Sequence, residues 1–318
     1  MKKSRDHHYI PIFFQKGFCD ENELIYVYDK KIDEIYPPSI PDRMFFKKNL
    51  NNLIHENKII SSSEKDVYGP IDTYGSKIVR TFRNNKSLTD TSTDFEKADL
   101  LNFMINLFWR TPTSDSLLNE LIEKEGLCNS YFGLSDEKTG KRLTDNDDSV
   151  KEIKERILND SEFAKHLKVI VANSDASKKE IFKLIKFWKL FSLNNNSNNE
   201  FLIGDMPFLF LNKNPTLDNV FEKVIFPISS NKVLILNKNN PLFIDDFTVN
   251  GINLCLMNKS KRFIGSGNKE LLEFYIEYYK KADSEFTVEN LFEHIDNLTK
   301  LENLTEYIEI NNCGQQRL

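Results

Sequence analysis

The chain has 318 residues, of which 40% are hydrophobic and 29% are charged, a composition typical of a globular protein with a sizeable core. Its 11 glycines and 10 prolines are too few for a collagen-like or Gly/Pro-rich disordered chain. The chain has 43 basic and 48 acidic residues, so its net charge is −5. It therefore lacks the overall positive charge that is typical of nucleic-acid-binding proteins. The length predicts one large domain or two closely packed ones.

The cysteines and the first residues indicate the cellular compartment. Cys19, Cys128, Cys255 and Cys313 lie far apart in the sequence, so neither a structural zinc site nor a disulfide framework is expected. Residues 1–8 are polar and lack the apolar segment of a signal peptide. No apolar run approaches the roughly 18 residues that a spanning helix needs. The sequence therefore predicts a cytoplasmic protein without a membrane segment.

Extended structure is predicted near the N-terminus, over residues 7–36. The aromatic and β-branched run at residues 24–29 is typical of a strand. We expect residues 32–36 to return beside it as a hairpin. The proline cluster at residues 37–41 is expected to end regular structure there.

Helices are predicted from about residue 63 to residue 193. Thr93 and Glu96 have the spacing of a capping box, and the helix that they begin is expected to end before Pro112. Residues 177–193 predict one long amphipathic helix. Its apolar side consists of Ile181, Leu184, Ile185, Trp188 and Phe191, and we expect its lysine-rich side to be solvated.

Short β-type runs alternate with helices in the last third of the chain. The runs are expected at residues 201–203, 208–211, 224–228, 233–236 and 262–264. Helices are expected at residues 246–257, 268–281 and 288–308. Together the elements predict a helix-rich α+β single domain with a small mixed or antiparallel sheet. We expect residues 1–265 to form this composite domain and residues 266–318 to form a helical extension packed on it.

Four segments, taken in order, carry a resemblance to a known family. They are HYIPIFFQKGF (8–18) with the following IYVYD (25–29), LFWRTP (107–112), FLIGDMP (201–207) and FPIS (226–229). Over residues 7–265 the chain resembles the bacterial domain-of-unknown-function 4238 family. The resemblance implies a shared fold and no particular reaction.

The chain departs from the pattern of this family at a few positions. Gly204 and Met206 stand where family members often have Ser and Asn. Of the acidic pair common on the first long helix of the family, only Asp66 and Asp72 are candidates here. Any mechanism that needs the missing groups is weakened accordingly.

Five polar residues are candidates for a site. His8 could act as a general base and Arg110 as a bidentate clamp for a phosphate or carboxylate. Asp205 could ligate a metal or orient a base, and Asp72 is a weaker catalytic candidate. Tyr9 is grouped with Arg110 as a ligand-binding residue. We expect His8 and Asp205 to be spatial neighbours at the edges of one sheet, and no residue is assigned to a metal.

Structural roles explain the same residues. His8 could cap a strand, Arg110 could complement the end of a helix dipole, and Asp205 could form an Asx-turn with its own backbone. The leading hypothesis is a phosphodiester-directed, nuclease-like hydrolase, for example a defence effector, with nucleic acid or a phosphorylated ligand as partner and no identified cofactor. The alternative is a non-catalytic binding or regulatory protein with a structural His/Arg/Asp network. Convergence in an open pocket favours the enzyme, whereas burial with satisfied hydrogen bonds favours the alternative.

Overall fold

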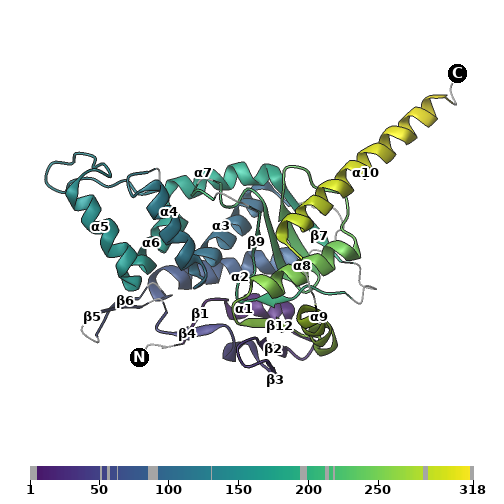
Figure 1. Ribbon diagram of the computed structural model, residues 1–318, viewed down its shortest axis with the longest axis horizontal. Helices are drawn as coiled ribbons and strands as arrows, with labels where there is room; N and C mark the ends of the chain where they lie inside the picture. The colour runs from purple at the N-terminus through teal and green to yellow at the C-terminus, as the bar shows by residue number, and fades with distance from the viewer. Residues whose placement is uncertain are drawn as a thin grey trace.

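The predicted helix-rich α+β fold is confirmed. The computed structural model describes residues 6–50, 52–55, 58–62, 64–84, 92–129, 131–193, 199–211, 215–217, 219–281 and 286–315. Figure 1 shows a helical part on the left and a part on the right that combines strands with the C-terminal helices. Within the described ranges, no helix is both long enough and apolar enough to cross a membrane.

Among the residues that the structure describes, the strands form two four-stranded antiparallel sheets and two strand pairs. The first sheet has the order β7 (Trp188–Ser192), β11 (Lys232–Leu236), β10 (Val224–Ser229) and β9 (Leu209–Phe210). The second has the order β3 (Glu34–Ser39), β2 (Ile25–Asp29), β12 (Phe263–Ser266) and β8 (Ile203–Gly204). The pairs are β1 (Asp6–His8) with β4 (Phe46–Lys48), and β5 (Asn52–His55) with β6 (Lys58–Ser62).

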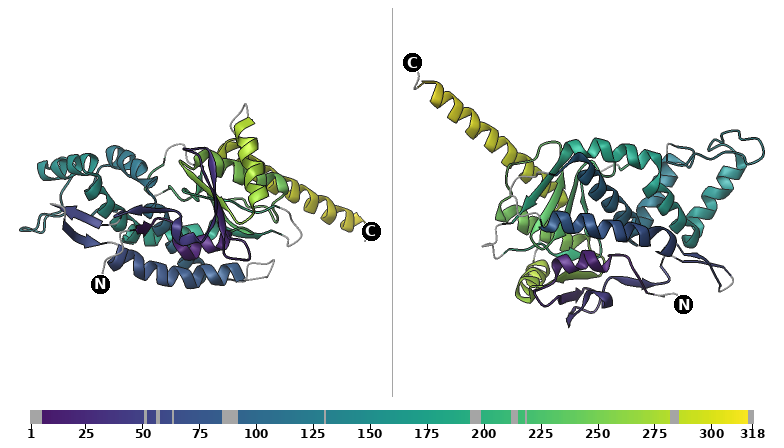
Figure 2. Two further views of the ribbon diagram at one scale, coloured as in Figure 1. Left: turned by 90° about the horizontal axis from the view of Figure 1, so that it is seen from below. Right: turned by 180° about the vertical axis from the view of Figure 1, so that it is seen from behind.

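The helices fall into two groups along the chain. The first group contains α1 (Ile12–Gln15), α2 (Gly69–Asn84), α3 (Asp94–Arg110), α4 (Ser114–Glu125), α5 (Asp148–Asn159), α6 (Ser161–Asn173) and α7 (Asp175–Leu184). The second contains α8 (Asp246–Lys259), α9 (Lys269–Lys281) and α10 (Val288–Gln315). Both views of Figure 2 show α10 extending away from the body of the molecule.

Helix α3 lies at the centre of the fold. The predicted capping box begins it: the Thr93 side chain accepts a hydrogen bond from the Glu96 amide, and the Glu96 carboxylate accepts one from the Thr93 amide. From Leu100 onward nearly every residue is buried, as expected for a helix that is covered on all sides. Phe108 of α3 contacts Phe208, which stacks on Phe226 of β10 at 4.6 Å between ring centroids. These rings join the helical part to the first sheet.

The predicted long helix at residues 177–193 is wrong from residue 185 onward. Helix α7 ends at Leu184, and Trp188–Ser192 forms β7, which pairs with β11 along its whole length. Trp188 and Phe191 are buried as expected, but from a strand. A short apolar run such as residues 188–192 fits both the helical and the strand period of hydrophobic residues. Its conformation is therefore set by pairing with β11, a strand that is distant in the sequence.

Two expectations near the N-terminus are also wrong. Residues 12–18, expected to be extended, form α1 and a following 3-10 turn, and they bury Phe14 and Phe18. The two residues lie four apart, which places both rings on the same helical face. Strand β3 continues through the prolines of its sequence to Ser39, because it is an edge strand and prolines need no ladder partner there.

Candidate functional site

The last residue of α3, Arg110, lies inside the protein and pairs with Asp72 of α2. Its Nη1 lies 2.8 Å from both carboxylate oxygens of Asp72. The Arg110 side chain is 3% exposed and the Asp72 side chain is 27% exposed. The guanidinium also lies over the Tyr68 ring, 4.7 Å from its centroid. The pair therefore connects two helices, and its carboxylate keeps some contact with solvent.

The end of α3 beyond Arg110 is held by donors from other residues. The buried ammonium of Lys168 donates to the Thr111 carbonyl at 2.9 Å and to the Asp115 carboxylate at 2.6 Å. Burial lowers the pKa of Lys168, although the charge of Asp115 opposes this shift. The Ser114 hydroxyl donates to the carbonyls of Trp109 and Thr111. Since carbonyls at a helix end need donors, these polar groups have a structural role.

Asp205, just after β8, binds a loop that is distant in the sequence. Its carboxylate accepts hydrogen bonds from the backbone amides of Lys261, Arg262 and Phe263 at 2.9, 2.8 and 3.2 Å. Burial raises the pKa of Asp205, and the three hydrogen bonds partly offset that effect. The predicted Asx-turn, in which Asp205 would bond the backbone two residues on, is therefore wrong. The Asp205 carboxylate instead binds the backbone of the loop that leads into β12.

The same loop is anchored a second time through Asp29 at the end of β2. Arg262 donates from Nε and Nη2 to the Asp29 carboxylate, at 3.0 and 2.7 Å for Oδ2. The Tyr36 hydroxyl of β3 donates to the same oxygen at 2.6 Å. Mainly through the Arg262 contact, the pKa of Asp29 is lowered to about 2. Asp29 and Asp205 together fix the loop between α8 and β12.

The remaining two candidates, Tyr9 and His8, have different environments. Tyr9 is buried near Asp205, and burial followed by the negative charge of Asp205 raises the pKa of the Tyr9 hydroxyl. His8 Nε2 lies 2.9 Å from the backbone carbonyl of Asp42, and the His8 ring contacts Phe46 across the β1–β4 pair. The structure thus brings Asp72 to Arg110 and Tyr9 to Asp205. The expected proximity of His8 and Asp205 stays a prediction.

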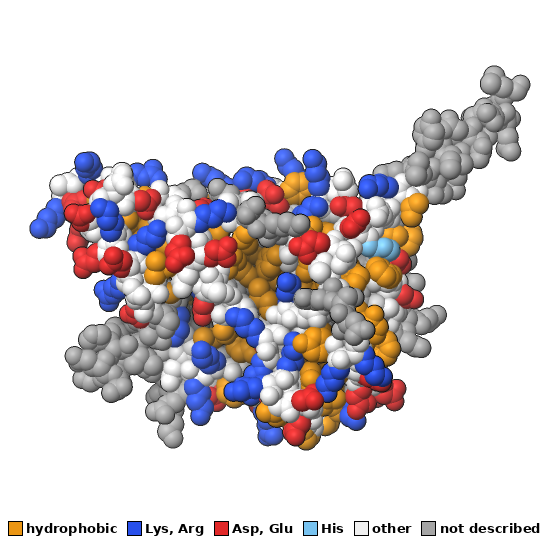
Figure 3. Space-filling view, in the orientation of Figure 1, with side chains coloured by type: hydrophobic (Ala, Val, Ile, Leu, Met, Phe, Trp, Pro, Cys, Tyr) orange, Lys and Arg blue, Asp and Glu red, His pale blue; other side chains and the backbone are white. Residues whose placement is uncertain are grey.

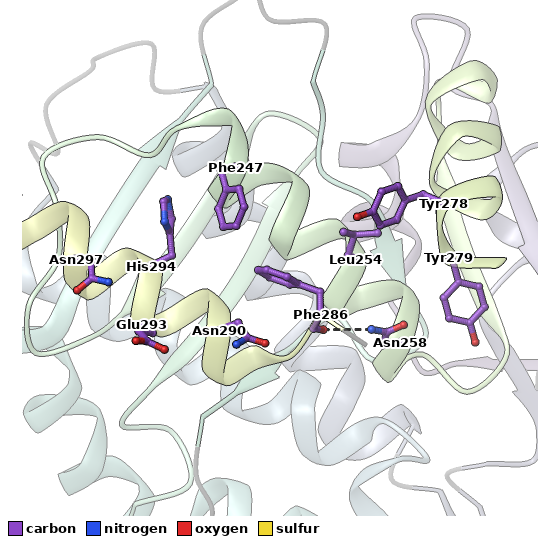
Figure 4. A pocket seen from close by; sticks show the side chains of 10 residues that line it. All are labelled: Phe247, Leu254, Asn258, Tyr278, Tyr279, Phe286, Asn290, Glu293, His294 and Asn297. Carbon is purple, nitrogen blue, oxygen red and sulfur yellow. Dashed lines mark hydrogen bonds between the residues drawn. The ribbon is translucent and has the colours of Figure 1, made fainter. Parts of the chain in front are cut away.

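A cavity of about 800 Å³ lies elsewhere, between α8, α9 and α10. Figure 4 shows Phe247, Phe286 and Tyr278 along this groove, with His294 and Glu293 on its α10 side. The His294 ring lies 4.4 Å from the Phe247 ring, and its Nε2 lies 3.0 Å from the Asp245 carboxylate. We call this cavity the C-terminal groove. Its volume is in the range of ligand and peptide sites.

The geometry defines a helix-rich α+β protein in which Arg110 and Asp205 of the motif segments bind other groups of the same chain. The family model described as "Protein of unknown function (DUF4238)" matches residues 6–270, and the chain belongs to this family. Searches of curated proteins and of solved structures found no similar protein. The matched region ends within α9, so the α10 side of the C-terminal groove lies beyond it.

Several of these residues had escaped sequence reasoning. Lys168 lies four residues after Ala164 and three before Val171, on the apolar side of α6. This helical spacing from buried residues indicates that the lysine is buried as well. The Asp29–Arg262 pair had no local signal because its members are 233 positions apart. Within the described part of the chain, no three His, Cys, Asp or Glu side chains form a group that could hold a metal ion.

Proposed function

We propose that the chain is a non-catalytic binding protein in which the motif residues hold the fold together. The observation that carries the proposal is the environment of Asp205. Both of its oxygens accept backbone hydrogen bonds from the loop at residues 261–263. A general base or metal ligand must direct a lone pair at a substrate or an ion, whereas these lone pairs are directed at the protein itself.

The environment of Arg110 supports the same proposal. An anion clamp presents its guanidinium donors to an incoming phosphate or carboxylate. Arg110 is instead almost fully buried, and its Nη1 is engaged by Asp72. The partner carboxylate already belongs to the protein, so the pair resembles a structural bond between α2 and α3. We also propose a cytoplasmic location, where free thiols such as those of Cys19 and Cys128 persist.

One observation favours the nuclease-like hydrolase as a second candidate function. Asp72 keeps 27% of its side chain exposed while Arg110 lies directly behind it. A carboxylate held in this way could activate water beside a nucleic-acid or phosphorylated substrate, with the arginine offsetting charge on the phosphoryl group. This candidate predicts that the activity depends on Asp72.

A hydrolysis assay separates the two proposals. The purified chain is incubated with labelled single- and double-stranded nucleic acids and with a chromogenic phosphodiester, each with Mg²⁺ or Mn²⁺. Wild type, Asp72→Asn and the exposed control Asp148→Asn are compared below their melting temperatures. We expect all three rates to equal that of a protein-free blank. A wild-type rate that is retained in Asp148→Asn and lost in Asp72→Asn would overturn the binding proposal and support the hydrolase.

A further inference from the structure

We infer that the C-terminal groove binds the lysine-rich face of α7 from a second copy of this chain. The inference rests on the proposed binding function and names the partner. It follows from two surfaces of the same molecule that match in hydrophobicity and are opposite in charge. The groove presents aromatic rings beside the Glu293 carboxylate, and α7 presents one aromatic ring among ammonium groups.

The groove exposes more apolar surface than a solvated helix pair needs. Phe247 of α8 and Tyr278 of α9 are each 52% exposed. Phe274 and Leu301, on the outer sides of α9 and α10, are more than half exposed as well. Figure 3 shows hydrophobic side chains gathered beside the base of α10. A contiguous apolar patch with a polar rim is typical of a protein-binding surface.

The polar side of the groove carries one carboxylate beside the amides of Asn290 and Asn297. Glu293 lines it from α10, and Asp245 lies behind His294. Among the α10 side chains that the structure describes, Glu293 lines the groove, whereas Asp296 lies 3.7 Å from the Lys223 ammonium. A partner of positive charge is therefore favoured over an acidic or a neutral one.

Helix α7 has the complementary composition. Phe182 is 65% exposed on its outer face. The exposed lysines of α7 are Lys178, Lys179 and Lys183, of which Lys178 pairs with Asp175 and Lys183 with Glu180. The exposed Lys186 follows in the 3-10 turn after α7. Phe182 could enter the aromatic part of the groove while the lysines meet the Glu293 carboxylate. This arrangement is the helix-in-groove mode of recognition.

The positions of the two surfaces favour a second copy as the source of this helix. In Figure 3 basic side chains over α7 and the hydrophobic patch beside α10 are visible on the same face. Two copies that meet through this face about a two-fold axis can each insert α7 into the groove of the other. Each favourable contact is then made twice, which strengthens the association.

Sedimentation equilibrium of the full chain over a range of protein concentrations and salt concentrations tests the inference. We expect wild type to form a dimer that weakens as salt rises, because salt screens the contacts between lysines and carboxylates. Glu293→Lys and Lys179→Glu should each raise the dimer Kd about tenfold or more, since two like charges then face each other. The double variant carrying both changes should regain most of the affinity.

A hydrophobic substitution provides a second, independent test. Phe182→Ser should weaken the dimer, whereas Phe95→Ser, a change at the 81% exposed Phe95 of α3, should leave it unchanged. A chain that stays monomeric at low salt would overturn the inference, as would a dimer insensitive to both Glu293→Lys and Phe182→Ser. These readouts do not involve hydrolysis, so failure of the dimer and failure of the binding proposal are distinguishable.

Discussion

The motif residues and the C-terminal groove use their polar and aromatic groups in opposite ways. Around Asp205, Asp29 and Arg110, which we call the polar frame, charged groups bind backbone amides or one another inside the fold. In the groove, aromatic side chains such as Phe247 and Tyr278 are half exposed. The difference teaches that the segments by which a family is recognised can be the ones that hold its fold together, while the surface that we propose as a binding site lies elsewhere.

The largest effect is expected from breaking the Asp72–Arg110 pair of the polar frame. In Asp72→Asn, Nη1 of the buried Arg110 faces a neutral amide instead of a carboxylate. We expect the free energy of unfolding to fall by about 3 kcal/mol, the range found when one partner of a buried ion pair is removed. Urea unfolding measures it. The exposed control Asp148→Asn should change stability by less than about 0.5 kcal/mol, and equal effects of the two changes would contradict the structural role.

Asp205→Asn should have the next largest effect. An NH₂ group replaces one carboxylate oxygen and cannot accept a hydrogen bond from the backbone at residues 261–263. The hydrogen bonds to the other oxygen remain, but their acceptor is no longer charged. We expect a loss of about 2 kcal/mol, comparable to one hydrogen bond to a charged group. Hydrogen exchange of the Arg262 and Phe263 amides should become faster in the variant. Unchanged protection of these amides would show that Asp205 does not hold the loop.

A pH dependence should identify the Asp29 contribution. The pKa of Asp29 is about 2 in the folded protein against an ordinary value of 3.8. Because the folded pKa is the lower one, this carboxylate stabilises the fold above about pH 3.8, and the contribution is lost as pH falls toward 2. Unfolding curves between pH 5 and 2, a window spanning roughly both pKa values, should show a shallower decline for Asp29→Asn than for wild type. Parallel declines would count against the Arg262 contact.

The smallest effect is expected in the groove. Tyr278→Ser removes a ring that is half exposed, so it should change the free energy of unfolding by less than about 0.5 kcal/mol. Its effect should appear in self-association instead. Thermal unfolding and sedimentation of the same sample measure both quantities. A strong loss of stability would mean that the groove belongs to the core and would remove the contrast between the two regions.

Elements with strong local signals were predictable from the sequence. The capping box of α3, strand β2 and the runs that form β10 and β11 lie where propensity and turn residues placed them. The expected hairpin also forms, with its second strand at Glu34–Ser39 instead of residues 32–36. Strand β7 was missed because its conformation depends on β11, more than 40 residues later. Local sequence cannot report such a contact, and tertiary pairing overrides helical spacing.

The candidate site was predictable only in part, for the same reason. The sequence identified Arg110 and Asp205 as notable, but the partner of Arg110 lies 38 positions away and those of Asp205 lie 56 to 58 positions away. Whether a charged side chain faces a ligand or its own fold depends on these distant partners. A local signal near the groove was the pair of aromatic residues Phe274 and Tyr278, four positions apart on the outer side of α9, of which Tyr278 lines the groove.

The dimer Kd of Arg110→Lys, measured by sedimentation beside its melting temperature, tests the central claim most directly. Lysine keeps the charge but replaces the planar guanidinium, whose Nη1 contacts both Asp72 oxygens, with a compact ammonium. The account predicts a lower melting temperature and a Kd equal to that of wild type, because Arg110 belongs to the polar frame and not to the binding surface. An unchanged melting temperature together with a much weaker dimer would contradict it.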